Sequence, residues 1–180
     1  MGTPMPEPTD PEVLLDAKRF QVIRKYQKTA SGERLPRQII RHPGAVVILP
    51  LLDGNRLVLI ENYRIAVEET LLELPAGTLE PEESPLATAH RELAEETGYR
   101  AGSMEPLLRF ASSPGILSEE MHLFVATDLS LGEMALEAGE EIIPKIVAWE
   151  EAVAMSRDGR IHDAKTLVGI LYYEMFRRRR

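Results

Sequence analysis

Glu92, Glu95 and Glu96 lie close enough in the sequence to form one acidic cluster. On a helix, Glu92 and Glu96 would stand one turn apart, with Glu95 beside them on the same face. Like charges at these spacings repel one another, so a solvated helix face is one interpretation and a bound cation is the other. Mg²⁺ would remove the repulsion, because it binds carboxylate oxygens together with substrate phosphates. The cluster is therefore a candidate metal site for chemistry on phosphorylated compounds.

The segment that carries the glutamates has clear helix boundaries. Ser84 can cap the N-terminus, and Pro85 suits the first position, where its missing N–H would have no partner. Gly98 can adopt the left-handed conformation that ends a helix. These signals predict a helix over residues 85–97. Its core-facing side would consist of Leu86, Ala89, Leu93 and Thr97.

Apolar patterns elsewhere predict the elements that must position this helix. Strands are expected over residues 19–27, 37–41, 45–52, 56–63, 71–75, 105–111, 120–126 and 142–148. Helices are expected over residues 149–156 and 164–177, and an acidic exposed loop over 131–141. This arrangement predicts an α+β fold in which helices cover both faces of a mixed central sheet.

Composition limits the class of protein. The chain has 180 residues, a hydrophobic share of 44% and a formal net charge of −8. It contains no long apolar run and no signal-peptide pattern, so we expect a soluble cytoplasmic protein without a membrane partner. The acidic balance argues against nonspecific binding to nucleic acid. The absence of cysteine excludes disulfides, thiolate catalysis and Cys-ligated zinc.

Three regions are expected along the chain. Residues 1–12 are rich in proline and predict a mobile tail. Residues 13–43 form an N-terminal strand region that is a candidate for dimerisation, and residues 44–180 form the main domain.

The acidic cluster belongs to a longer pattern, G-x5-E-x7-R-E-L-x-E-E-x-G, which runs from Gly77 to Gly98. This pattern resembles the Nudix box, the signature of the Nudix hydrolase superfamily. The resemblance implies an α/β/α sandwich that cleaves a nucleoside diphosphate linked to another group, with the help of a divalent metal. Such a metal would neutralise the pyrophosphate and acidify a bound water.

The resemblance also implies roles for the residues of the box. The metal, Mg²⁺ with Mn²⁺ as a substitute, would be bound by Glu92, Glu95, Glu96 and the backbone carbonyl of Ala76. Four further residues would keep the box in shape: Gly77, Glu83, Arg91 and Gly98. Glu83 and Arg91 would form an ion pair that fixes the loop against the helix.

The flanking segments resemble the ADP-ribose pyrophosphatase branch of the superfamily. The similar segments are Glu61–Arg64, Glu73–Gly77, Ser113–Gly115 with Ser118 and Glu119, and Asp163–Thr166. This branch splits ADP-ribose into AMP and ribose 5-phosphate.

The branch resemblance implies four substrate contacts. Arg64 would contact phosphate or adenosine, Glu73 the terminal ribose side, and Glu119 the region near the metals, while Pro114 would shape the pocket. Simpler interpretations stay open: Arg64 could pair with a nearby carboxylate, and Pro114 could form only a turn. Asp163 could be a helix N-cap.

The catalytic candidates are Glu140, Glu141 and Glu96. By resemblance, the general base is a glutamate just before the last strand, and we favour Glu140, with Glu141 next. Glu96 would act through the metal.

Three functions stay open. The first is Mg²⁺-dependent hydrolysis of ADP-ribose or a similar ADP-sugar, the second is hydrolysis of another nucleoside diphosphate sugar, and the third is regulation through ADP-ribose binding without cleavage. The expected partners are a small-molecule substrate and a second copy of the chain. In such a homodimer, Phe20, Tyr26 or Ile40 would lie near the adenine.

Overall fold

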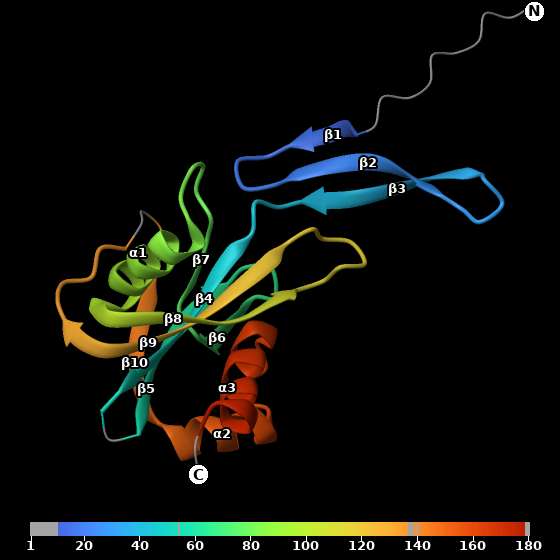
Figure 1. Ribbon diagram of the computed structural model, residues 1–180. Coiled ribbons are helices and arrows are strands. Elements are labelled where there is room, and N and C mark those ends of the chain that lie inside the picture. Colours follow the sequence, from blue (N-terminus) through green and yellow to red (C-terminus); the bar gives the residue numbers. More distant parts are fainter. Residues whose placement is uncertain (1–10, 54, 137–138, 140, 179–180) are drawn as a thin grey trace, which may run out of the picture. The chain divides into compact units, whose positions relative to one another are not determined.

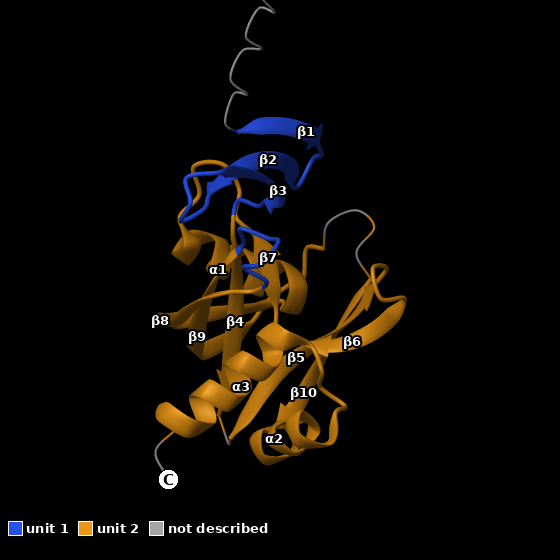
Figure 2. Ribbon diagram, turned by 90° about the vertical axis from the view of Figure 1, so that its right-hand side faces the viewer, with its two compact units in different colours: residues 1–43, 113–119 blue, residues 44–112, 120–180 orange. Residues whose placement is uncertain are grey.

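The computed structural model describes residues 11–53, 55–136, 139 and 141–178 (Figure 1). The chain divides into two compact units (Figure 2). One unit contains the N-terminal residues up to Pro43 together with residues 113–119, and the other contains residues 44–112 and 120–180. Among the described residues, no helix has the length and apolar character needed to span a membrane.

The first unit contains a three-stranded antiparallel sheet in its described part. Its strands, in spatial order, are β1 (Glu12–Asp16), β2 (Gln21–Lys28) and β3 (Arg34–Arg41). β1 was not predicted, and it begins at Glu12, which was expected to lie in the mobile tail. Glu12 lies opposite Arg24 of β2 in the sheet, and its carboxylate binds Nη1 of Arg24 at 2.7 Å. Residues 1–10 lie outside the described residues, so the tail stays a prediction there.

Residues 113–119 join the first unit through the end of β3. The N–H of Ile40 donates a hydrogen bond to the carbonyl of Ile116 at 2.8 Å, and the N–H of Ser118 donates to the carbonyl of Ile40 at 2.9 Å. Ile40 and Leu117 form a parallel bridge. The segment that connects β8 to β9 is therefore held by backbone bonds to β3.

The second unit is built on a mixed sheet of seven strands in its described part. The strands are β4 (Ala45–Leu52), β5 (Arg56–Arg64), β6 (Glu69–Glu73), β7 (Ala76–Thr78), β8 (Tyr99–Ala111), β9 (Glu120–Leu131) and β10 (Ile142–Ala148). Their order is β10-β5-β4-β9-β8, with β6 paired to β5 and β7 paired to β4. β4 and β9 are parallel and the other pairs are antiparallel, so the predicted mixed sheet is confirmed.

Three helices cover the two faces of this sheet: α1 (Pro85–Thr97), α2 (Trp149–Asp158) and α3 (Ala164–Phe176) (Figure 1). Side chains alternate along β4, as they must on a strand. Val46 and Ile48 pack in one buried cluster with Leu93 of α1. Val47 and Leu49 pack in the other cluster, which contains Ile170 of α3 and also residues of α2. The predicted sandwich, with helices on both faces, is confirmed.

Several predicted details were wrong. Leu86 is 45% exposed, so it does not belong to the buried side of α1, which includes Ala89, Leu93 and Thr97. β9 extends to Leu131, so the acidic loop begins one residue later than predicted. β7 was not predicted, although it leads into the segment before α1.

Candidate active site

The helix α1 begins and ends where the sequence predicts. The hydroxyl of Ser84 accepts a hydrogen bond from the N–H of Ala87 at 3.2 Å, and Pro85 stands at the first helical position. Gly98 has a φ of 74°, the left-handed conformation that closes a helix. The three glutamates are therefore carried on a helix with fixed ends.

Glu96 connects α1 to the segment that carries Ala76. Its side chain is almost fully buried, with 3% of the residue exposed, and Oε2 accepts a hydrogen bond from the N–H of Ala76 at 2.9 Å. Glu92 lies against the next residue, because a Cβ atom on Gly77 would stand 1.9 Å from Oε1 of Glu92. Only glycine at position 77 permits this approach. The backbone of Ala76 and Gly77 thus lies against two of the predicted ligands.

Arg91 binds three carboxylates at once. Its Nη1 atom donates to Glu92 at 2.8 Å and to Glu95 at 2.9 Å, and its Nη2 atom donates to Glu83 at 3.0 Å. Burial of the guanidinium works to lower its pKa, but the hydrogen bonds and charges of the three glutamates outweigh that effect, so the pKa of Arg91 lies above its ordinary value. The predicted pairing of Glu83 with Arg91 is present.

Glu83 is held as a carboxylate by the same contacts. The hydrogen bond from Arg91, followed by one from the hydroxyl of Thr88 at 2.8 Å, keeps the pKa of Glu83 below its ordinary value. This arrangement fixes the loop before α1 against the helix.

The donor set around α1 fits a hard divalent cation in its chemistry, because carboxylate and carbonyl oxygens are the ligands that Mg²⁺ prefers. Glycine at position 77 leaves the approach to Glu92 open. Within residues 11–178, apart from the undescribed positions, no three acidic or histidine side chains are arranged as a complete metal site. Instead, Nη1 of Arg91 bridges Glu92 and Glu95. A bound cation would take over part of the charge neutralisation that Arg91 provides.

Two predicted substrate residues bind each other. Arg64 donates two hydrogen bonds to Glu73, with Nε to Oε1 at 2.7 Å and Nη2 to Oε2 at 2.6 Å. These bonds raise the pKa of Arg64 above its ordinary value. Glu73 is fully buried, whereas 40% of the Arg64 side chain is exposed. The simpler interpretation of Arg64, pairing with a carboxylate, is therefore present, and the substrate contacts of both residues stay predictions.

Two further partners of this segment, which the sequence did not predict, lie on α3. Lys165 forms an ion pair with Glu73, and the hydroxyl of Thr166 accepts a hydrogen bond from the N–H of Leu74. Asp163 is the N-cap of α3, as one interpretation predicted, since its side chain accepts from the N–H of Thr166. The similarity of Asp163–Thr166 to the ADP-ribose pyrophosphatase branch was the only signal that pointed to them.

Pro114 and Glu119 lie in the first unit. The carbonyl of Ser113 accepts hydrogen bonds from the N–H groups of Ile116 and Leu117, so Pro114 does form part of a turn. Glu119 Oε1 stands 3.4 Å from Nδ1 of His42. The substrate roles of Pro114 and Glu119 stay predictions.

The predicted general base, Glu140, lies outside the described residues, and Glu141 is exposed. The loop that leads to them begins beside the end of α1. The N–H of Gly132 donates to the carbonyl of Gly98 at 2.8 Å, and the N–H of Ala135 donates to the carbonyl of Glu95 at 3.2 Å. The start of the loop is thus fixed next to a predicted ligand.

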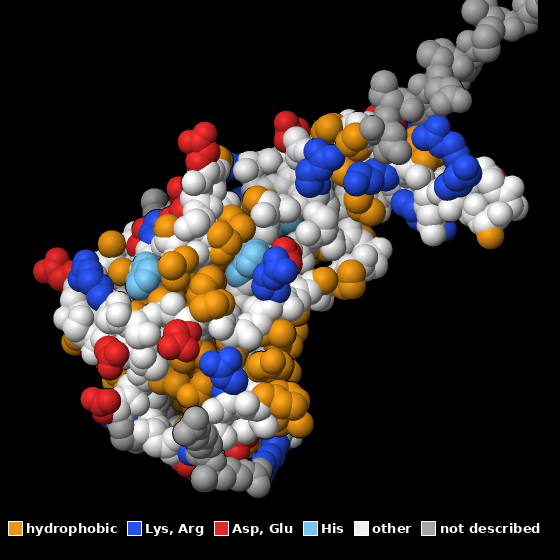
Figure 3. Space-filling view, in the orientation of Figure 1, with side chains coloured by type: hydrophobic (Ala, Val, Ile, Leu, Met, Phe, Trp, Pro, Cys, Tyr) orange, Lys and Arg blue, Asp and Glu red, His pale blue; other side chains and the backbone are white. Residues whose placement is uncertain are grey.

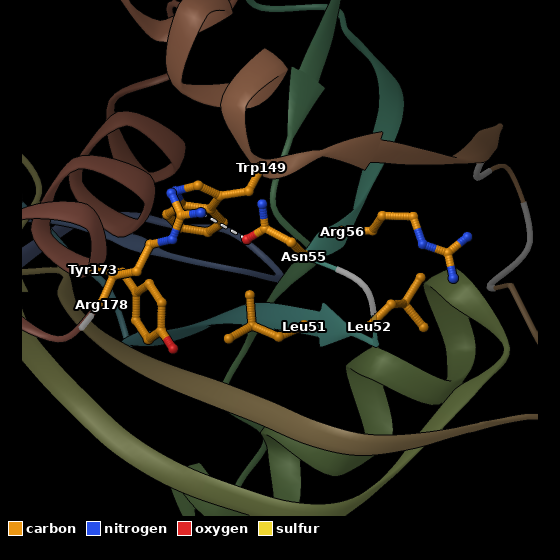
Figure 4. A pocket seen from close by; sticks show the side chains of 7 residues that line it. All are labelled: Leu51, Leu52, Asn55, Arg56, Trp149, Tyr173 and Arg178. Atoms are coloured by element: carbon orange, nitrogen blue, oxygen red, sulfur yellow. Dashed lines mark hydrogen bonds between the residues drawn. The ribbon is translucent and has the colours of Figure 1, made fainter. Parts of the chain in front are cut away.

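A cavity of about 260 Å³ lies elsewhere in the second unit (Figure 4). It is lined by Leu51, Leu52, Asn55, Arg56, Trp149, Tyr173 and Arg178. This place is at the β4–β5 hairpin, whereas the residues of β4 that pair with β7 lie at the other end of the strand. Two of its polar side chains bind each other, since Nη2 of Arg178 donates to Oδ1 of Asn55 at 2.8 Å. No predicted site residue lines this cavity.

Comparisons with known proteins agree with the architecture. A protein-family model described as "NUDIX domain" matches residues 41–167. The chain is 40% identical to the methanol dehydrogenase activator of Bacillus methanolicus, over 81% of this chain and 80% of that protein. It is 37% identical to the ADP-ribose pyrophosphatase of Bacillus subtilis (strain 168), over 91% of this chain and 90% of that protein.

Among solved structures, a crystal structure titled as an ADP compounds hydrolase is similar with a TM-score of 0.79 and 23% identity. The match covers 92% of this chain and 90% of that chain. This likeness establishes the fold.

Proposed function

This chain belongs to the NUDIX domain family, and we propose that it hydrolyses the pyrophosphate bond of ADP-ribose or a similar ADP-sugar with the help of a divalent metal. The observation that carries the proposal is the contact of Glu96 and Glu92 with the backbone of Ala76 and Gly77. It joins the acidic helix to the segment expected to supply a carbonyl ligand. The 37% identity to an ADP-ribose pyrophosphatase over most of the chain supports this substrate class.

In the proposed reaction, Glu92, Glu95, Glu96 and the carbonyl of Ala76 would hold Mg²⁺ or Mn²⁺. When bound, the metal supplies neutralisation of the phosphate charge and an acidic water. Arg91 keeps Glu92 and Glu95 close together.

A carboxylate of the 132–141 loop, Glu140 or Glu141, accepts a proton from the attacking water. The water oxygen bonds to one phosphorus while a bond of the P–O–P bridge breaks, which yields AMP and ribose 5-phosphate from ADP-ribose. Arg64, whose side chain is 40% exposed beside the buried Glu73, is the residue that would bind a substrate phosphate.

A second candidate function is the activation of another enzyme, because a relative with 40% identity is named a methanol dehydrogenase activator. Every acidic position of the box is present in this chain, which favours hydrolysis. Binding without cleavage would fit a chain that lacked some of these carboxylates.

A substrate panel tests the proposal. The full chain is incubated with ADP-ribose, ADP-glucose, NADH, GDP-mannose or FAD, with Mg²⁺ and separately with Mn²⁺, and the products are identified by mass spectrometry. We expect AMP and ribose 5-phosphate from ADP-ribose. Faster cleavage of GDP-mannose than of ADP-ribose would show that the preferred substrate is another nucleoside diphosphate sugar. Tight binding of ADP-ribose without AMP, with either metal, would contradict hydrolysis.

We also propose that the chain forms a homodimer through residues 13–43. The first unit exposes several large apolar side chains: Val13, Leu14, Leu15 and Phe20. Figure 3 shows hydrophobic and basic side chains on the surface of these strands. Light scattering should give twice the mass of one chain, and deletion of residues 1–20 should give a monomer. A wild-type monomer at micromolar concentration would contradict the proposal.

A further inference from the structure

The first turn of α3 holds Leu74 through a hydroxyl group. Thr166 is fully buried, and its Oγ1 atom accepts a hydrogen bond from the N–H of Leu74 at 2.8 Å. The same hydroxyl donates to Oδ2 of Asp163 at 2.6 Å. Asp163 also caps the helix by accepting from the N–H of Thr166. Because a carboxylate can only accept, the hydroxyl of Thr166 donates its proton to Asp163, and an oxygen lone pair is left to accept from Leu74.

Lys165 holds the residue before Leu74. Its Nζ atom binds the fully buried carboxylate of Glu73 and lies 3.0 Å from Oδ1 of Asp163. Only 11% of the Lys165 side chain is exposed, compared with 40% of Arg64, the other cation on Glu73. Lys165 is therefore the counter-charge that is shielded from solvent, and a shielded ion pair is weakened less by salt.

Gly169, one turn further along α3, lets the helix backbone lie close to the side chain of Leu74. A Cβ atom at position 169 would stand 2.5 Å from Cδ1 of Leu74. The absence of a side chain thus lets Thr166 and Lys165 reach the backbone and the carboxylate that they bind.

The same short segment is held from its other side by β4 and α1. The N–H of Ile48 donates to the carbonyl of Pro75 at 2.9 Å, and Glu96 accepts from the N–H of Ala76. Each residue from Glu73 to Ala76 therefore has a partner outside the segment, and Glu73 and Leu74 each have one on α3. A displacement at Leu74 would be passed two residues along the chain to Ala76.

We propose that Thr166 and Lys165 are positioning residues, which set the carbonyl of Ala76 and the carboxylate of Glu96 in place for the divalent metal. The inference rests on the proposed function, because that function makes Ala76 and Glu96 metal ligands. It assigns to the first turn of α3 a role at a site to which it contributes no ligand.

Binding of Mn²⁺ alone, followed by electron paramagnetic resonance of the full chain without substrate, tests the inference. Thr166→Val keeps the shape of the side chain but cannot accept from Leu74, and we expect it to weaken Mn²⁺ binding by about tenfold, as changes around metal ligands do. Thr166→Ser keeps the hydroxyl and should stay within about twofold of the wild type, a small fraction of that effect. The concentration of Mg²⁺ needed for half-maximal turnover should shift in the same way.

Lys165→Met supplies a second variant, which keeps Arg64 on Glu73 and so should fold. It should weaken Mn²⁺ binding in the same direction, and Lys165→Arg should restore part of it. Val153→Ala on α2 is the control. Val153 is buried in the apolar cluster that contains Leu74 and Ile170, but its side chain has no group that can form a hydrogen bond or ion pair with residues 73–76. This variant should lower the melting temperature and leave the affinity for Mn²⁺ unchanged.

The outcomes separate two proposals. If wild-type protein cleaves ADP-ribose, and both Thr166→Val and Lys165→Met bind Mn²⁺ like the wild type, the first turn of α3 only stabilises the fold and this inference is overturned. If wild-type protein binds Mn²⁺ but cleaves no substrate, the proposed function fails while the binding comparison still tests the positioning role. Wild-type protein that binds no Mn²⁺ would overturn both.

Discussion

Oε2 of Glu96 accepts a hydrogen bond from the N–H of Ala76 at 2.9 Å, so a buried carboxylate of α1 fixes the backbone twenty residues before it. A metal bound by both residues would therefore meet a segment whose position is already set. This is the preorganisation that electrostatic catalysis requires.

Glu96→Gln should lower turnover of ADP-ribose by roughly a hundredfold or more, the scale of losing one electrostatic group at a transition state. The amide oxygen of glutamine can still accept from the N–H of Ala76, so the melting temperature without metal should change little. Steady-state kinetics at saturating Mg²⁺ gives the measurement. A loss smaller than about tenfold would show that Glu96 is not essential to the metal site.

Gly77→Ala should weaken metal binding and activity together. The new Cβ atom would stand 1.9 Å from the carboxylate of Glu92, so the segment and the side chain must move apart. We expect a loss in Mn²⁺ affinity of about tenfold or more. Gly115→Ala is the stability control, since nothing lies within 4 Å of a Cβ atom there. Unchanged Mn²⁺ binding in Gly77→Ala would mean that the close approach of Glu92 is not needed.

Arg91→Met should destabilise the protein in the presence of EDTA, because three carboxylates lose their shared cation. A loss of about 2 kcal/mol in the free energy of unfolding corresponds to roughly 4–8 °C for a chain of this size. Mg²⁺ should raise the melting temperature of the variant more than that of the wild type, since it binds the freed carboxylates. Arg157→Met, on the exposed side of α2, is the matched control. Equal melting temperatures for Arg91→Met and wild type in EDTA would contradict the role assigned to Arg91.

The acid sensitivity of the protein should depend on Glu83. Hydrogen bonds from Arg91 and Thr88 lower the pKa of Glu83 in the folded state, relative to 4.5 in the unfolded chain. The stabilisation is thus fully present above about pH 4.5 and is lost as the pH falls through the folded-state pKa. Urea denaturation in EDTA should show the largest difference between wild type and Glu83→Gln at pH 7, and a smaller one below pH 4.5.

The exposed Glu80→Gln variant serves as control for that comparison and should follow the wild type at every pH. A difference between wild type and Glu83→Gln that grows on acidification would have the wrong sign for a lowered pKa.

Glu140→Gln should lower turnover by about a hundredfold or more if Glu140 accepts the proton of the attacking water. Mn²⁺ binding should be unchanged, because the residue is not a proposed ligand. Glu141→Gln is the matched variant and should retain near-normal turnover. The reverse result at saturating Mg²⁺, with Glu140→Gln active and Glu141→Gln impaired, would assign the base to Glu141.

Local signals in the sequence predicted α1 well. Ser84, Pro85 and Gly98 each act on the backbone next to them, so the helix has the predicted bounds of 85–97. The exposure of Leu86 was not predictable in this way, because burial depends on the tertiary packing of the helix and not on its own sequence. β1 was missed for a related reason, since its pairing with β2 is set by tertiary contacts such as that of Glu12 with Arg24.

In the site, too, contacts within one motif were predictable and contacts between distant segments were not. The Nudix pattern predicted that Glu83 pairs with Arg91, because both lie within one contiguous motif. The pairing of Glu73 with Lys165 and of Leu74 with Thr166 depends on where α3 packs on the sheet. The apolar pattern of the sequence does not predict that position. A short similar segment, Asp163–Thr166, marked the place without indicating the contact.

The bond between Leu74 and Thr166 spans 92 residues, and this separation bears on how the protein is made. During synthesis the acidic helix leaves the ribosome long before α3 exists, so Leu74 and Glu73 then lack the partners that bury them. A chain that stops before Asp163 would carry the whole acidic motif and still have no support for Ala76 from α3. If Thr166 and Lys165 position Ala76 as proposed, a product that stops before Asp163 would keep the acidic motif but bind Mn²⁺ more weakly than the full chain.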